Sequence, residues 1–173
     1  MMRKWMLTIV VASAVLLSGC SNNIETGVAF LEAEKYEQAK DAFEQEIEKG
    51  KNLDEAYRGF GIACFELEAY EDAIKAFESA IKNETDETAI LYSMMGACYV
   101  ETGEYEKALD VYTKALSMEN ITDDNKQEVQ YNLIAVYEKM KDWDAAKKQM
   151  EAYKKAYPDD KRIEKEADFL ETR

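Results

Sequence analysis

Residues 61–81 read GIACFELEAYEDAIKAFESAI, and the second half of this stretch recurs along the chain. The string Tyr-x-x-Ala occurs at residues 36–39, 70–73 and 105–108, and residues 143–146 carry the variant WDAA. The alanines at motif position four are 34, 35 and 38 residues apart. A large apolar residue follows each of them by four positions: Phe43, Phe77, Tyr112 and Met150. Self-similarity at such a period predicts a stack of similar structural units.

Each unit also carries a distinctive residue in its first half. Gly27, Gly61 and Gly96 stand twelve residues before their motif alanines, and Ile134 takes this place in the fourth unit. A glycine inside a helix costs about 1 kcal/mol relative to alanine. That cost is reasonable where a bulky side chain packs against bare backbone. Together with the helical spacing of the apolar residues, this predicts two crossing helices per unit and a looser crossing in the fourth.

This pattern resembles the tetratricopeptide repeat, a helix–turn–helix unit of about 34 residues. The resemblance covers about residues 22–158 and implies an all-α fold, a right-handed α-α superhelix of about four repeats. The implied repeats are residues 24–51, 54–85, 87–120 and 124–158, and residues 159–173 are expected to form a capping helix. Two residues depart from the family pattern, because Glu46 and Tyr153 stand where the middle repeats have Ala80 and Ala115.

The composition excludes several classes of function. The 173 residues include 22 Lys and Arg but 36 Asp and Glu, a net charge of −14, whereas nucleic-acid binding needs clustered basic residues. The chain has no histidine, which excludes His-dependent catalysis and His-ligated metals. We therefore expect no enzymatic activity, no metal and no cofactor. An enzyme that uses paired acidic residues on cell-wall polymers is the least favoured alternative.

The first 19 residues differ from the rest of the chain. Arg3 and Lys4 precede an apolar run from Trp5 to Leu17, and small residues follow it. A basic start, a short apolar run and small residues at a cleavage site are typical of a secretory signal peptide. The run is shorter than the roughly 20 residues that a transmembrane helix needs. Residues 1–19 are therefore predicted to be a cleaved signal peptide.

The signal ends in Leu17-Ser18-Gly19-Cys20, which resembles the lipobox of bacterial lipoproteins. The resemblance implies cleavage before Cys20 and attachment of diacylglycerol and a further acyl chain such as palmitate, so that residues 20–23 form a lipidated cysteine with a short tether. The expected location is the extracytoplasmic face of the cell membrane, or the periplasmic face of the outer membrane in a host with two membranes. An ordinary signal peptide that ends in cysteine by chance is the alternative.

In the tetratricopeptide family, the first helix of each repeat lines a concave surface that binds proteins. The matching positions of this chain are mostly apolar at the centre and acidic at the rim. They are Val28, Leu31, Glu32, Arg58, Ile62, Phe65, Glu66, Ser93, Ala97, Val100, Glu101, Tyr131, Ala135, Glu138 and Lys139. Some relatives hold a C-terminal carboxylate with a Lys/Asn/Arg clamp, and its positions are Val28, Ile62 and Ala97 here, so we expect no such binding.

These observations predict a membrane-anchored scaffold or adaptor in the bacterial cell envelope. Its groove is expected to bind an amphipathic or apolar segment of a partner protein, with basic flanks as one variant. Two alternatives stay open. The C-terminal helix could cover the groove through Ile163, Phe169 and Leu170, or the groove could pair with a second copy of the chain, since two-fold association is common.

Cys64 and Cys98 fall inside the predicted first helices of the second and third repeats. Free cysteine is among the residues that are most often buried, so we expect both to be packing residues. A disulfide between them remains an alternative in an exported protein, although the two residues differ by one position in the repeat register.

Overall fold

The structure is a computed structural model that describes residues 22–83 and 88–171. The predicted signal peptide and Cys20 lie outside these residues. The described part contains nine helices and no strand, which confirms the all-α prediction. The helices are α1 (Asn23–Glu32), α2 (Tyr36–Glu48), α3 (Leu53–Glu66), α4 (Tyr70–Asn83), α5 (Ala89–Glu101), α6 (Tyr105–Ser117), α7 (Asp123–Lys139), α8 (Trp143–Ala156) and α9 (Arg162–Glu171).

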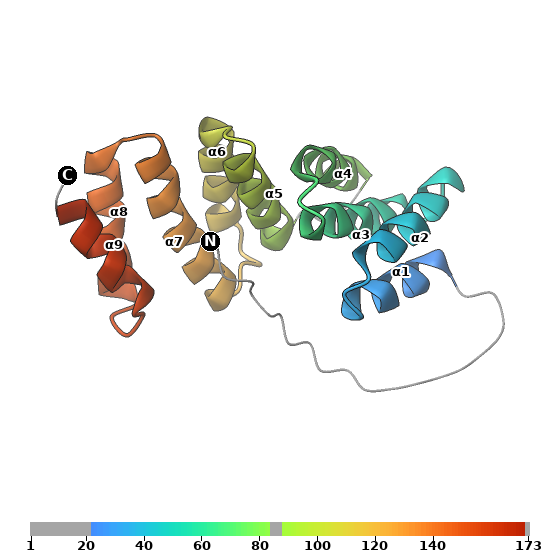
Figure 1. The fold of residues 1–173 in the computed structure, drawn as a ribbon, viewed down its shortest axis with the longest axis horizontal. Coiled ribbons are helices and arrows are strands. Elements are labelled where there is room, and N and C mark those ends of the chain that lie inside the picture. Colours follow the sequence, from blue (N-terminus) through green and yellow to red (C-terminus); the bar gives the residue numbers. More distant parts are fainter. Residues whose placement is uncertain (1–21, 84–87, 172–173) are drawn as a thin grey trace.

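The helices follow one another in a single elongated row, from α1 at one end to α9 at the other (Figure 1). The consecutive pairs α1 with α2, α3 with α4, α5 with α6 and α7 with α8 pack closely, and α2 packs as extensively against α3 as against α1. We call α1, α3, α5 and α7 the first helices and their partners the second helices. Neighbouring first helices also touch directly, α1 against α3 and α5 against α7. This is an α-α solenoid with a helix added at its C-terminal end.

The turn between the two helices of a pair has the same geometry in all four pairs. A residue in the left-handed region follows each first helix: Glu34 (φ 56°), Glu68 (φ 61°), Gly103 (φ 79°) and Lys141 (φ 60°). The amide of the next residue donates across the turn to a helix carbonyl, as Lys35 does to Phe30 at 2.9 Å and Asp142 does to Tyr137 at 2.9 Å. These are Schellman motifs, in which glycine is the favoured left-handed residue.

The left-handed position allows a matched pair of substitutions. We expect Gly103→Ala to lower the free energy of unfolding by about 1 kcal/mol, because a side chain at positive φ is strained. A Cβ added at Gly103 would meet no atom within 4 Å, so backbone strain is the only cause. Lys141→Gly should raise stability by a few tenths to about 1 kcal/mol for the same reason. Urea unfolding followed by circular dichroism measures both, and changes of the same sign in the two variants would contradict this account.

The core of each of the first three repeats is an aromatic ring laid on a glycine. A Cβ on Gly27 would lie 2.6 Å from Cζ of Phe43, and one on Gly61 would lie 2.5 Å from Cε1 of Phe77. Tyr112 covers Gly96 in the third repeat in the same way. Each of these rings is at most 1% exposed. The sequence pattern of glycine and aromatic residue therefore marks the crossing of the two helices.

The fourth repeat solves the same packing problem with different side chains. Ile134 replaces the glycine and Met150 replaces the aromatic residue, and both are buried in one cluster with Tyr153. Methionine is flexible enough to fill the irregular space that a branched neighbour leaves. The bulk that the other repeats place on the second helix is here shared between α7 and α8.

Glu46 and Tyr153, the two residues that depart from the family pattern, make polar contacts to the next structural unit. The Glu46 side chain is buried, with the residue 4% exposed, and its carboxylate accepts hydrogen bonds from Asn52 Nδ2 at 3.2 Å and Lys49 Nζ at 3.3 Å. Asn52 directly precedes α3. Tyr153 makes the corresponding contact at the other end of the row, where its hydroxyl reaches Asp160 ahead of α9. Both residues therefore fix the start of the helix that follows.

Cys64 and Cys98 are both free and buried, as expected for packing residues. Burial raises the pKa of the Cys64 thiol to about 11 and that of the Cys98 thiol to about 12. Both groups are therefore protonated at neutral pH, and thiols in this state are poor nucleophiles.

Candidate interaction surface on the first helices

The residues predicted to line the groove lie on α1, α3, α5 and α7, and none of them is fully buried. We call the exposed side of these four helices the first-helix face. Leu31, Arg58, Ile62, Phe65, Ala97, Val100, Tyr131, Ala135 and Glu138 are half-buried on it, and Val28 is exposed. Direct contact joins α1 to α3 and α5 to α7, and α4 packs against both α3 and α5.

Large apolar side chains are unusually exposed on the first-helix face. Val28 on α1 is 43% exposed and Ile90 on α5 is 55% exposed, and these are the two large apolar residues of the described ranges that reach such exposure. The second helices carry no large apolar residue with such exposure. Single exposed apolar residues are ordinary, but these two lie on first helices that also carry half-buried Ile62 and Val100, so the first-helix face has an apolar stripe along the row.

Sequence reasoning missed Ile90. It stands three residues before Ser93 and seven before Ala97, so the helical period puts all three on one side of α5. The family positions taken for the groove begin only at Ser93, although α5 begins at Ala89. The periodicity, followed one turn further back, could have found Ile90.

Charge is distributed unequally between the two sets of helices. The first helices carry ten acidic and three basic residues, whereas the second helices carry twelve acidic and nine basic residues. Glu32, Glu66 and Glu101 occupy equivalent positions, as the last residue of α1, α3 and α5. All three are exposed. The first-helix face is therefore an apolar stripe with an acidic edge.

Tyrosines of the preceding second helices lie beside this acidic edge. The pKa of Tyr36 is raised, mainly by burial and next by the negative charge of Glu66. The pKa of Tyr70 is raised in the same way, by burial and by Glu101. Tyr70 also packs edge-on against Phe65, with ring centroids 5.9 Å apart. The motif tyrosine of one repeat therefore lies close to the terminal carboxylate of the next.

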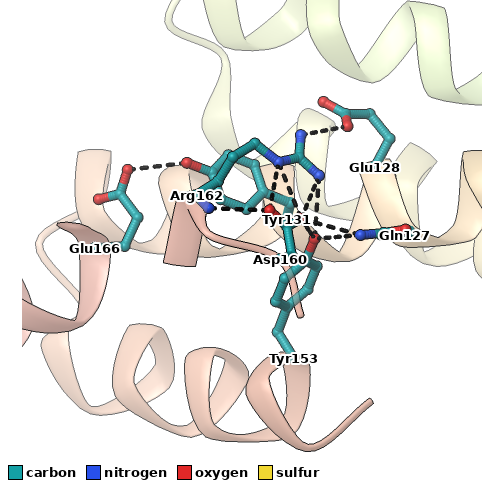
Figure 2. A network of polar contacts seen from close by, with 7 residues as sticks. All are labelled: Gln127, Glu128, Tyr131, Tyr153, Asp160, Arg162 and Glu166. Carbon is teal, nitrogen blue, oxygen red and sulfur yellow. Dashed lines mark hydrogen bonds and ion pairs between the residues drawn. The ribbon is translucent and has the colours of Figure 1, made fainter. Parts of the chain in front are cut away.

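The C-terminal end of the row is fixed by a polar network between α7, α8 and α9 (Figure 2). Arg162 at the start of α9 donates from Nη1 to Glu128 at 2.8 Å and from Nη2 to Asp160 at 2.8 Å. Gln127 Nε2 donates to the Tyr153 hydroxyl at 3.1 Å and to Asp160 at 3.0 Å. Hydrogen bonds from the Arg162 side chain, and next from the Tyr153 hydroxyl, hold the pKa of Asp160 well below its usual range.

Helix α9 covers the fourth-repeat end of the first-helix face and no more. The Arg162 guanidinium lies 4.5 Å from the ring centroid of Tyr131, whose hydroxyl donates to Glu166 at 3.1 Å. Ile163 and Leu170 are buried with Ile134 in the cluster between α7 and α8. Helix α9 packs mainly on α8 and lies at the opposite end of the row from α1 and α3 (Figure 1). The side chain of Phe169, the third residue expected to cover the groove, lies outside the described part.

Glu138 is the polar side chain of this face with the most unusual environment. Its Oε1 atom is buried and has no hydrogen-bond partner among the described residues. Burial, and next the negative charge of Glu166, raise the pKa of Glu138 to about 7, and Lys139 acts weakly in the opposite direction. The carboxyl of Glu138 therefore changes its charge near neutral pH, beside helix α9.

This environment predicts a pH-dependent effect of Glu138→Gln on stability. In the unfolded chain the carboxyl titrates near its ordinary 4.5, whereas in the folded chain its pKa is about 7. Between these values the unfolded state loses the proton first, so wild-type stability falls as pH rises and the loss is complete above pH 7. Below pH 4.5 both states are protonated and the loss is absent. Glutamine cannot ionise.

We therefore expect Glu138→Gln to match the wild type at pH 4 and to exceed its stability at pH 8 by about 1–2 kcal/mol, a value that allows for solvent screening at this half-buried site. Urea unfolding at several pH values measures the difference. An advantage that stays the same at every pH would show that Glu138 is not the titrating group.

The described residues contain neither a group of side chains that could bind a metal ion nor a helix that could span a membrane. Within 22–83 and 88–171 no three His, Cys, Asp or Glu side chains come together in a way that could hold a metal ion. In the same ranges no helix combines the length and the apolar character needed to cross a bilayer.

Comparison with known families identifies the repeats. Two family models described as tetratricopeptide repeat match residues 24–87 and 128–160. A third, described as regulator of microtubule dynamics protein 1-3, matches residues 66–141. Together the three ranges span helices α1 to α8.

Solved structures of similar fold include YrrB, described as a TPR protein with an unusual peptide-binding site. It is 21% identical, has a TM-score of 0.67, and the match covers 79% of this chain and 68% of YrrB. MamA from Desulfovibrio magneticus RS-1 is 16% identical, with a TM-score of 0.70 and coverage of 80% and 76%. A tetratricopeptide repeat protein from Parabacteroides merdae is 20% identical, with a TM-score of 0.70 and coverage of 86% and 57%. At these identities the likeness concerns the fold, and together with the family models it shows that this chain is a solenoid of tetratricopeptide repeats.

Proposed function

We propose that the chain is a lipid-anchored interaction scaffold of the bacterial cell envelope, and that its first-helix face binds an amphipathic or apolar segment of a partner protein. The observation that carries the proposal is the position of the exposed apolar residues. Val28 and Ile90 both lie on the first helices, the helices that line the concave interaction surface of such solenoids. The similarity in fold to YrrB, which is described as having a peptide-binding site, supports it.

Anchoring is proposed from the sequence at Cys20. Helix α1 begins at Asn23, three residues after Cys20, and three residues span at most about 10 Å. A lipid on Cys20 would therefore hold the solenoid close to the bilayer and raise the effective concentration of a membrane-bound partner. Two acyl chains are sufficient for stable attachment, whereas one is not.

The anchor is tested by the intact mass of the protein purified from membranes of the producing cells. The expected N-terminus is a lipidated Cys20, and Cys20→Ser should lack the added mass of the lipid. An unmodified residue 20 with the leader still attached would overturn this part of the proposal.

The binding face is tested with exposed residues, so that folding is not disturbed. We compare the wild type with the double variant Val28→Glu and Ile90→Glu, and with Thr113→Glu, an exposed position on the second helix α6. Proteins crosslinked to each in membranes of the producing cells are isolated and identified by mass spectrometry. We expect the same identified partner with the wild type and Thr113→Glu, and at least tenfold less of it with the double variant. Equal recovery in all three would contradict the proposal.

Self-association through the first-helix face is the second candidate, because the same exposed Val28 and Ile90 could pair with those of another copy. Sedimentation of residues 20–173 with Cys20→Ser decides between the two. A monomer at tens of micromolar excludes self-association. A dimer that Ile90→Glu dissociates would replace the proposed partner segment with a second copy of the chain.

A further inference from the structure

We propose that the partner segment is a cationic amphipathic helix, whose apolar side meets the first-helix face and whose Lys or Arg residues meet Glu32, Glu66 and Glu101. This inference rests on the proposed function and specifies the chemistry of the partner. The acidic edge is complementary in charge to such a segment, and the three glutamates carry a cost to stability that no ion pair within the described chain offsets.

The cost to stability arises because the three glutamates lie at the C-terminal ends of their helices. A helix has partial negative charge at its C-terminus, which favours basic and disfavours acidic side chains by about 0.3–1 kcal/mol each. The second helices α4, α6 and α8 follow this rule and have lysine in their last turn, whereas the second helix α2 has no basic residue there. The first helices α1, α3 and α5 each end in glutamate and have no basic residue in the last turn.

No described cation compensates for this arrangement, although the Tyr36 side chain forms a hydrogen bond with Glu66. Glu32, Glu66 and Glu101 are exposed, and none of them forms an ion pair with a described cation. The lysines that are paired belong to other carboxylates, as Lys75 does to Asp72 at 3.0 Å. A set of equivalent acidic positions, one in each of the first three repeats, is therefore left for cations that come from outside the chain.

The apolar stripe beside this edge fixes the other half of the partner. Val28 and Ile90 are exposed, and Leu31, Ile62 and Val100 are half-buried next to the acidic residues. A segment that covers them must present apolar side chains on one side and cations along its border. A basic amphipathic helix has this distribution, and a purely apolar segment lacks the cations.

The repeat spacing also predicts the spacing of the cations. Packed helices lie about 8–10 Å apart, and α1 packs directly against α3. A helical peptide rises about 1.5 Å per residue, so a helix laid along the row would need cations about five to seven residues apart. Residues at i, i+7 and i+14 lie nearly on one side of a helix, which makes this spacing compatible with an amphipathic pattern.

The test uses three designed 21-residue peptides with the same leucine and alanine face. They carry Lys, Gln or Glu at positions i, i+7 and i+14. Binding of the fluorescent peptides to residues 20–173 with Cys20→Ser is measured by anisotropy at 50 and 300 mM salt. We expect the Lys peptide to bind at least tenfold more tightly than the Gln peptide at low salt. The advantage should shrink at high salt, because exposed ionic contacts are screened.

A matched pair of triple variants locates the contact. Glu32→Lys, Glu66→Lys and Glu101→Lys reverse the acidic edge, whereas Glu44→Lys, Asp110→Lys and Glu151→Lys make the same change of charge at exposed positions of α2, α6 and α8. The first triple should reverse the order of the Lys and Glu peptides, and the second should preserve it. An identical effect of both triples would show that only the net charge of the protein matters and would overturn the inference.

Failure of the inference is distinguishable from failure of the proposed function. If the three peptides bind equally and Ile90→Glu weakens all of them, the face binds apolar segments and the cationic requirement is wrong. If no peptide binds at 1 mM, the cationic helix is rejected as the ligand, and the isolation experiment with Val28→Glu and Ile90→Glu still decides whether the face binds a protein.

Discussion

Replacement of Phe77 by alanine is expected to lower the free energy of unfolding by about 3–5 kcal/mol. The ring is fully buried, and it fills the space that Gly61 leaves on the first helix, where a Cβ would approach it to 2.5 Å. Alanine would remove this contact and leave a cavity between α3 and α4 that bare backbone cannot fill. Because domains of this size are stable by only about 5–15 kcal/mol, the loss would be a large part of the total.

Urea unfolding followed by circular dichroism at 222 nm measures this loss. Val28→Ala is the control, because Val28 is exposed on the first-helix face and surface substitutions usually stay within about 0.5 kcal/mol. A loss below about 1.5 kcal/mol for Phe77→Ala would show that the ring does not hold the two helices together.

Removal of the Arg162 side chain is expected to detach α9. The Arg162→Ala variant would leave the carboxylates of Asp160 and Glu128 without their cation, with the Asp160 side chain only 12% exposed. Breaking a fully buried pair costs about 3–5 kcal/mol, and because the Arg162 side chain is 31% exposed we expect about 2–3 kcal/mol. The amides of residues 163–170 should lose most of their protection from hydrogen exchange.

Two variants make this result specific. Arg162→Lys keeps the charge but loses the planar fork that contacts Asp160, Glu128 and Tyr153 together, so its effect should be intermediate. Lys161→Ala removes an exposed neighbouring cation and should change stability by less than about 0.5 kcal/mol. If Arg162→Ala behaves like Lys161→Ala, the network of Figure 2 does not hold α9.

The repeated fold could be predicted from the sequence because its determinants are local and recur. Gly61 and Phe77 are sixteen residues apart, and the same pair returns as Gly27 with Phe43 and Gly96 with Tyr112. A contact that is repeated three times at constant spacing is visible without coordinates. The groove residues were assigned by the same register, which placed Ile62, Phe65 and Val100 on the first helices.

The features that could not be predicted from the sequence are contacts that occur only once in the chain and are not repeated from unit to unit. Glu46 and Tyr153 were recognised as departures, but their roles depend on Asn52 and Asp160, which lie outside the repeat pattern. The contact of Arg162 with Glu128 joins residues 34 positions apart, and no periodic signal marks it. The effect of Glu166 in α9 on the pKa of Glu138 likewise has no periodic signal in the sequence.

The turns within the helix pairs are a further feature that residue type alone does not predict. Gly103 is a recognisable turn residue, but Glu34, Glu68 and Lys141 adopt the same left-handed conformation without a local sequence signal. Packing of the flanking helices imposes this conformation, and the repeat register, rather than the residue type, predicts where it occurs.

The most direct test of the central claim, that partners bind the first helices, is a photocrosslinking residue placed at position 90 or at position 113 in the producing cells. Both positions are exposed, the first on α5 and the second on α6. The account predicts that position 90 crosslinks to an identified partner with at least tenfold greater yield than position 113. Equal yields, or a greater yield at position 113, would contradict it.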